Sequence, residues 1–253
     1  MLMAITREIS PRFNECELTH LERQPIDLTL AVKQHHQYED ALSLLGCIVY
    51  RLPTAPGLPD SVFVEDCALV LDEVALITRP GADSRKNEVD SVASALRPYR
   101  QLRFIEPPGT IDGGDILCIG RTIYVGLTTR STSNAVHQMR THLQPYGYTV
   151  KDVVVHGCLH LKSAVTQVSE RTLLLNPSWM DPALFGMDFI EVHPVEPGAA
   201  NAVFVKEKVI YPSGFPKTRQ RLEARGIPLV LVDASEVAKA EGAVTCCSLI
   251  FSI

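Results

Sequence analysis

The chain has 253 residues, of which 46% are hydrophobic and 21% charged, enough to bury a large core. A formal net charge of −5 without a basic stripe argues against a nucleic-acid or anionic-membrane binder. No apolar run reaches the roughly 18 residues of a membrane span. Seven scattered cysteines are an odd set and not a disulfide framework, which predicts free thiols in a reducing cytoplasm.

The N-terminal part is predicted to contain a strand, a helix and a second strand. Residues 1–9 read as a short strand, and the polar segment 10–24 is long for a simple connection. Asp27 can cap a helix over about 28–45, where apolar residues keep helical spacing. A strand follows over 47–52.

From residue 61 onward, the order strand, strand, helix, strand repeats. The leading strands are predicted at 61–66, 111–119, 159–167, 201–205 and 245–253. The second strands are predicted at 74–78, 122–127, 172–175 and 209–211. Helical segments are predicted at 84–99, 133–144, near Pro182, and at 216–226. The closing strands are predicted at 102–105, 148–155, 189–192 and 229–232. Leading strands roughly 40 to 50 residues apart indicate a propeller or a repeat array.

The last repeat has only its first strand, and residues 1–52 supply the missing strand, helix and strand. Joining the N- and C-terminal segments would remove exposed sheet edges. We therefore predict a single domain over residues 1–253, an α/β five-bladed propeller of pseudo-symmetric ββαβ modules. An open doubly wound sheet also fits the alternation, although no G-x-G-x-x-G opens a helix, which counts against its nucleotide-binding versions.

Unusual polar residues gather on the leading strands. They are Glu65 and Asp66, Asp112 and Asp115, His160, Asn201 and Cys246. Burying carboxylates in apolar strands costs several kcal/mol unless they are paired. If the leading strands line the axis, these groups converge, and a thiol, an imidazole and carboxylates are the parts of a nucleophilic-thiol enzyme. Strand alternation predicts that Cys246 faces a ligand, whereas Cys247, Leu249 and Phe251 form an apolar stripe.

Each of these elements also has a structural interpretation. The two thiols could both be core residues, and Glu65-Asp66 could be a salt-bridged strand end. The stretch 112–115 could be a hairpin turn, since Asp-Gly and Gly-Gly favour turns. The stretch 156–160 holds three possible zinc ligands, but a tetrahedral site usually draws on more than one segment, so no metal is expected. Their joint placement in corresponding repeats favours a catalytic site.

These motifs resemble a known family. They are Val64-Glu65-Asp66 with Ile77-Thr78-Arg79-Pro80-Gly81, Asp112-Gly113-Gly114-Asp115, Leu159-His160-Leu161-Lys162-Ser163, Ala199-Ala200-Asn201 and Thr245-Cys246-Cys247-Ser248. Together they resemble the dimethylarginine dimethylaminohydrolases of the guanidino-group-modifying (pentein) superfamily, which have a five-bladed α/β propeller. The resemblance implies hydrolysis of N-omega-methylated arginines to citrulline and methylamines through a covalent thiouronium, without a metal or organic cofactor.

The resemblance also implies residue roles. Cys246 becomes the nucleophile, His160 the general acid and base, and Asp112 the carboxylate that orients His160. The implied substrate contacts are Glu65 and Asp66 at the guanidinium nitrogens with Asp60 nearby, Arg85 and Arg130 at the α-carboxylate, Leu18 in a mobile lid, and Ala240 at the α-amino end.

The chain departs from the family pattern at three points. Ser131-Thr132 replaces the usual Thr-Asn after the arginine, and Ala240 is smaller than the common branched residue. Lys162 stands where an arginine deiminase would have an aspartate that grips the second terminal nitrogen, which leaves room for N-methyl groups.

Two other functions stay open from the sequence. One is an arginine deiminase-like or other guanidino- or ureido-substrate hydrolase, and the other is a non-enzymatic propeller of the ribosome anti-association type. The expected partner is a small guanidino substrate, and a homodimer is possible.

Overall fold

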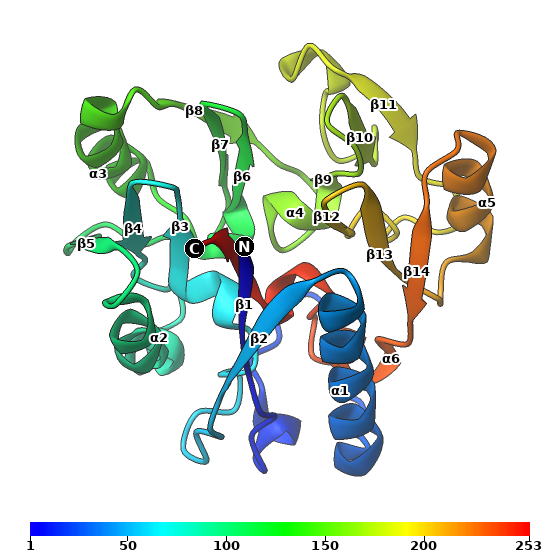
Figure 1. Ribbon diagram of the computed structural model, residues 1–253, viewed down its shortest axis with the longest axis horizontal. Helices are drawn as coiled ribbons and strands as arrows, with labels where there is room; N and C mark the ends of the chain where they lie inside the picture. Colours follow the sequence, from blue (N-terminus) through cyan, green and yellow to red (C-terminus); the bar gives the residue numbers. More distant parts are fainter.

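The computed structural model describes residues 1–253 and contains five three-stranded sheets arranged around a centre (Figure 1). In every sheet, the first strand is antiparallel to the second and the second is parallel to the third. The α/β five-bladed propeller predicted from the sequence is thereby confirmed. None of its helices has the length and apolar character needed to cross a membrane.

Four modules follow one another along the chain. The first contains β3 (Ala68–Val70), β4 (Val74–Ile77), η3 (Asp83–Glu88), α2 (Val89–Leu96) and β5 (Gln101–Phe104). The second contains β6 (Ile116–Ile119), β7 (Thr122–Leu127), α3 (Ser133–Leu143), η5 (Gln144–Tyr146) and β8 (Thr149–Val154). The third contains β9 (Val165–Gln167), β10 (Thr172–Leu175), η6 (Pro182–Leu184) and β11 (Asp188–Glu191). The fourth contains β12 (Val203–Val205), β13 (Lys208–Pro212), α5 (Pro216–Ala224) and β14 (Leu229–Val232), and α6 (Ser235–Ala238) follows it.

The two chain ends complete the fifth module, as predicted. Its members are β15 (Leu249–Ser252), β1 (Leu2–Arg7), η1 (Phe13–Glu15), α1 (Leu28–Leu44) and β2 (Cys47–Leu52). Strand β1 lies between β15 and β2 in the sheet, and both termini lie near the centre of the molecule (Figure 1). The N-terminal amine donates a hydrogen bond to the carbonyl of Ile253 at 3.1 Å. The two chain ends are therefore held together in one sheet, with β15 and β2 as its edge strands.

Local sequence explains where the long helices begin and end. The Asp27 carboxylate accepts a hydrogen bond from the backbone N–H of Leu30 at 3.0 Å, which caps α1. Gly46 then adopts a φ of +80° just after this helix, a conformation that favours glycine. Thr132 caps α3 through Ala135.

Each sheet contributes to the cores on both of its faces. All four residues of β4 are buried: Ala75 and Ile77 pack with α2, while Val74 and Leu76 pack with the next module. Because successive strand side chains point to opposite faces, one short strand joins two neighbouring cores. Burial of each such large aliphatic side chain contributes about 1.5–3 kcal/mol.

The leading strands are shorter than predicted, because most polar residues precede them. Tight helical turns hold these residues: η2 (Val64–Cys67), η4 (Gly113–Asp115), α4 (Leu161–Ala164) and η7 (Thr245–Cys247). Asp, Asn and Gly favour such turns, because their side chains or backbone freedom compete with the strand ladder. The prediction that the polar groups lie on the strands was therefore wrong in detail, although the turns bring them to the same place in each module.

This correction extends to Cys247. It lies in η7 and packs in the core beside α1, whereas Leu249 and Phe251 of β15 pack in the neighbouring core beside α2. The three residues do not form the single stripe that strand alternation predicted. The stretch 112–115 is likewise a turn, but it precedes β6 and does not join two strands of a hairpin.

Candidate active site

The turns that precede the strands bring most of the predicted site residues to one small cavity of about 20 Å3. Seven of the predicted residues line it: Asp60, Asp66, Arg85, Arg130, His160, Ala240 and Cys246. The convergence predicted from the repeat pattern is thus present. The cavity also includes Glu17, Phe63, Leu159, Glu241 and Gly242, which sequence reasoning had not assigned to the site.

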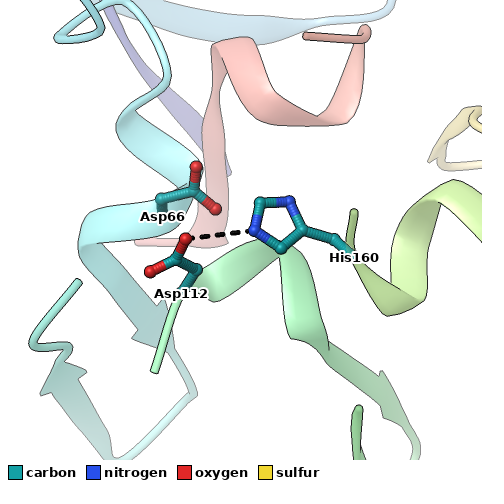
Figure 2. A group of neighbouring side chains, drawn as sticks. All are labelled: Asp66, Asp112 and His160. Atoms are coloured by element: carbon teal, nitrogen blue, oxygen red, sulfur yellow. Dashed lines mark hydrogen bonds and ion pairs between the residues drawn. The ribbon is translucent and has the colours of Figure 1, made fainter. Parts of the chain in front are cut away.

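His160 and Asp112 form the central pair of the site. The Nε2 atom of His160 lies 3.0 Å from Oδ2 of Asp112, and the carboxylate is fully buried (Figure 2). Burial by itself would lower the pKa of His160, but the carboxylates of Asp115, Asp66 and Asp112 outweigh it and raise the pKa to about 9. At neutral pH this imidazole is therefore a cation that can donate a proton.

The carboxylate of Asp115 binds the segments next to His160 and Asp112. It accepts hydrogen bonds from the backbone N–H of Leu161 at 2.9 Å and from the hydroxyl of Ser131 at 2.6 Å. The Ser131 hydroxyl oxygen accepts in turn from the backbone N–H of Asp112 at 3.2 Å. Burial raises the pKa of Asp115 to about 6, against the opposing effect of His160 and these donors. Ser131, one of the departures from the family pattern, thus links Asp112 to Asp115 through its hydroxyl group.

The two glycines between these aspartates allow close approach of neighbouring segments. A Cβ on Gly113 would lie 1.9 Å from the carbonyl oxygen of Glu65, and one on Gly114 would lie 2.7 Å from Nδ1 of His160. Any larger residue here would push the turns apart. The glycines therefore have a steric role as well as a turn-forming one.

The carboxylate of Asp66 lies near the ring of His160 (Figure 2). It accepts a hydrogen bond from Arg85 at 2.7 Å and one from the backbone N–H of Gly114 at 2.8 Å. Burial opposes its ionisation, but Arg85 and His160 overcome this and lower the pKa of Asp66 to about 2. Arg85 is also held by Glu88 at 2.8 Å. Its predicted contact with a substrate carboxylate stays a prediction.

The Glu65 side chain does not line the cavity that contains Cys246. Its carboxylate accepts from Lys162 Nζ at 2.6 Å and from the Thr245 hydroxyl at 2.9 Å, and it lines a second cavity of about 290 Å3. Burial raises the pKa of Glu65, and the Lys162 cation opposes this rise. Of the neighbouring acids 65 and 66, only Asp66 lines the cavity with Cys246, so a guanidinium contact by Glu65 stays a prediction.

The surroundings of Cys246 favour the uncharged form of its thiol. Burial, together with the negative charges of Glu65 and Asp66, raises its pKa well above the ordinary value. The free site therefore holds a neutral thiol beside an imidazolium. A cation bound between the thiol and Asp66 would offset these negative charges and make the thiolate easier to form.

The polar N-terminal segment covers the cavity. Glu17 lines it and donates its backbone N–H to the carboxylate of Asp60 at 3.1 Å. The guanidinium of Arg130 donates to the Thr19 hydroxyl at 2.9 Å. Leu18 is half-buried against the core beside α1 and is not among the cavity-lining residues. Glu17 could have been assigned to the site from the sequence because it is a charged residue within the predicted lid.

One group of side chains has metal-ligand potential. Candidate ligand atoms of Asp66, Asp112 and His160 lie within 4.8 Å of one another. The same side chains take part in the His160–Asp112 hydrogen bond and the Asp66–Arg85 ion pair. His156 and Cys158, weighed as zinc ligands from the sequence, belong to no such group.

Comparison with known proteins agrees with this geometry. No family model matches the chain. The N(G),N(G)-dimethylarginine dimethylaminohydrolase of Streptomyces coelicolor is 42% identical over 248 residues, which cover 97% of this chain and 95% of that protein.

Two solved structures of the same kind of enzyme are also similar. A cysteine-to-serine mutant from Pseudomonas aeruginosa, complexed with citrulline, has a TM-score of 0.93, 33% identity and 98% coverage of both chains. A histidine-to-glycine variant with an S-methyl-L-thiocitrulline adduct has a TM-score of 0.92 and 33% identity, covering 99% of this chain and 100% of that one. The chain belongs to the dimethylarginine dimethylaminohydrolase family.

Proposed function

We propose that this protein hydrolyses dimethylarginine and monomethylarginine to citrulline and the corresponding methylamines. The observation that carries the proposal is the convergence of Cys246, the His160–Asp112 pair and the ionised Asp66 on one buried cavity. A guanidinium is planar, cationic and a poor electrophile, so a fixed carboxylate has to orient it for the thiolate. The relatives described above are named as dimethylarginine dimethylaminohydrolases, which supports the dimethylarginine part of the proposal.

The reaction follows from the charges of the site. Asp66 holds the guanidinium, and Cys246 loses its proton to solvent as the cation enters. The thiolate adds to the guanidinium carbon, and the His160 imidazolium protonates the departing dimethylamine as the carbon–nitrogen bond breaks. A thiouronium is left on Cys246. The now neutral His160 takes one proton from water, whose oxygen attacks the same carbon. As the carbon–sulfur bond breaks, the second water proton passes to the departing sulfur, which releases citrulline and restores the thiol of Cys246.

The remaining residues are proposed to hold the amino-acid end of the substrate. Arg130 and Arg85 bind the α-carboxylate, while Asp60, Ala240 and the lid residue Leu18 surround the α-amino group. Three of these groups are occupied without substrate: Asp60 accepts from Glu17, Arg130 donates to Thr19, and Arg85 is paired with Asp66 and Glu88. Substrate binding would replace the contacts of Asp60 and Arg130.

Methylated substrates are favoured over arginine by the position of Lys162. Its ammonium is paired with Glu65 at 2.6 Å, so this position offers no second carboxylate to the terminal nitrogens. Arginine would have one of its terminal nitrogens without an acidic partner, whereas a methylated nitrogen needs none.

Citrulline formation from dimethylarginine, monomethylarginine and arginine tests the proposal. We expect kcat/KM for both methylated substrates to exceed that for arginine. Equal or faster turnover of arginine would point to the arginine deiminase-like alternative. No citrulline from any guanidino compound, together with binding to ribosomal subunits, would support the non-enzymatic alternative.

We further propose that the chain works as one catalytic domain in the cytoplasm. All seven cysteines are unpaired, which fits a reducing compartment. A homodimer stays a prediction that size-exclusion chromatography with light scattering would test.

A further inference from the structure

Glu241 has an unusual backbone conformation at the edge of the active site. Its φ is +56°, and only one other non-glycine residue, Lys206 at +55°, has a positive φ. Side chains with a Cβ rarely adopt this region, and such residues persist where their surroundings hold them in place. Gly242 follows, where a Cβ would lie 2.3 Å from the ring of Phe63. The chain is thus closely constrained at this point.

The Glu241 side chain binds the lid segment. Its carboxylate accepts hydrogen bonds from three consecutive backbone N–H groups, those of Thr19 at 2.8 Å, His20 and Leu21. Three N–H groups that converge on one carboxylate form charge-assisted hydrogen bonds, which are stronger than neutral ones. The two segments are more than 200 residues apart in sequence, so this contact fixes the lid to the body of the protein.

The position of this contact separates two spaces. Glu241 and Gly242 line the small cavity of Cys246 and also a larger one of about 470 Å3. His20 and Leu21 line only the larger cavity. Glu241 therefore connects residues 20 and 21, which line the larger cavity, to the boundary that both cavities share.

We propose that Glu241 is a positioning residue, a latch that holds residues 19–21 closed over the active site. It differs from two of the other lid contacts. Asp60 and Arg130 hold the lid with groups that the proposed substrate would engage, so substrate binding would replace those contacts. The Ser84 hydroxyl, which donates to the Glu17 carboxylate, is a further contact outside the proposed substrate groups. The Glu241 contact uses no group assigned to the substrate and can hold the lid throughout the reaction. The kinetic part of this inference rests on the proposed function.

Hydrogen exchange of the free protein tests the latch without any substrate. Glu241→Gln keeps the size of the side chain but replaces one acceptor oxygen by a donor that faces N–H groups. Glu241→Gly removes the carboxylate and also relieves the backbone strain. Lys206→Gly is the matched control, because it relieves the same φ in the turn between β12 and β13.

We expect the amides of residues 19–21 to exchange at least about tenfold faster in both Glu241 variants and at the wild-type rate in Lys206→Gly. Unchanged exchange in the Glu241 variants would overturn the latch. Equal acceleration in the control would also overturn it, because the effect would then not be specific to the Glu241 carboxylate.

Steady-state kinetics test what the latch does for the reaction. Lid closure holds substrate and transition state alike, so its loss should raise KM several-fold and leave kcat within about twofold. Faster exchange with a wild-type KM would overturn the role in substrate retention. If the wild-type protein turned over no guanidino compound, the proposed function would fail, while the exchange result would still decide the latch.

Discussion

Two adjacent thiols show how position decides chemistry in this fold. Cys246 and Cys247 are both buried, and burial raises the pKa of each. Cys246 lies in the cavity with an imidazolium and an ionised carboxylate. Cys247 donates to the carbonyl of Ala243 at 3.5 Å and packs in the core beside α1. Because the pKa is raised for both thiols, it does not distinguish them. The proposal that Cys246 is the nucleophile rests instead on the imidazole and the carboxylate that share its cavity.

The largest expected difference in kcat is the one between serine variants of the two cysteines. We expect Cys246→Ser to lower kcat by more than about 10^3-fold, because no thiolate can form, while substrate binding stays measurable. Cys247→Ser should change kcat far less. Citrulline assays and calorimetric binding would measure both, and the reverse order of effects would overturn the assignment of the nucleophile.

The next largest expected effect on activity concerns the His160–Asp112 pair, which lies near Cys246 and not near Cys247. Asp112→Asn keeps the size of the side chain but removes the charge that orients and stabilises the imidazolium. We expect kcat to fall by about 10^2- to 10^4-fold with a smaller change in KM. Single-turnover kinetics would measure the loss, and wild-type kcat in this variant would remove Asp112 from the mechanism.

The pH dependence follows from the same pair. The proton on His160 is needed for the leaving amine, so kcat/KM should fall as pH rises past about 9. Stability changes in the same direction, because the pKa of this histidine is raised from 6.5 to about 9 on folding. The ion pairs of His160 thus stabilise the fold fully below about pH 6.5 and are lost as pH rises through about 9.

Urea unfolding of wild type and of His160→Asn at pH 6 and pH 9.5 would measure this contribution. The two proteins should differ in free energy of unfolding more at pH 6 than at pH 9.5. An equal difference at both values would contradict the raised pKa of His160.

The smallest expected effect concerns Cys247, the thiol that packs in the core. Cys247→Ala leaves a space of about one methyl group beside α1, so we expect a loss of about 1 kcal/mol in stability and an unchanged kcat. Thermal unfolding and citrulline formation would measure both. A loss of activity without a loss of stability would mean that Cys247 contacts the reacting groups.

Much of the fold was predictable, because its repeats are strongly patterned. Strands β7, β10 and β14 have the predicted boundaries, and the closure of the fifth module by both chain ends is confirmed. The starts of the leading strands were not predictable, since periodicity cannot distinguish a strand from a tight turn over three or four polar residues.

The site was predictable as a set of residues but not as a geometry. The convergence of Asp66, His160 and Cys246 followed from equivalent positions in the repeats. The turning of Glu65 toward Lys162 and the grip of Glu241 on the lid depend on contacts across about 100 and more than 200 residues. No local pattern in the sequence encodes such contacts.

Mass spectrometry of the quenched reaction tests the central claim most directly. His160→Gly should form the thiouronium slowly or not at all, and wild type should carry it transiently during turnover of dimethylarginine. We predict that peptide mapping places the added mass on Cys246. An adduct on Cys247, or citrulline formation by His160→Gly at the wild-type rate, would contradict the account.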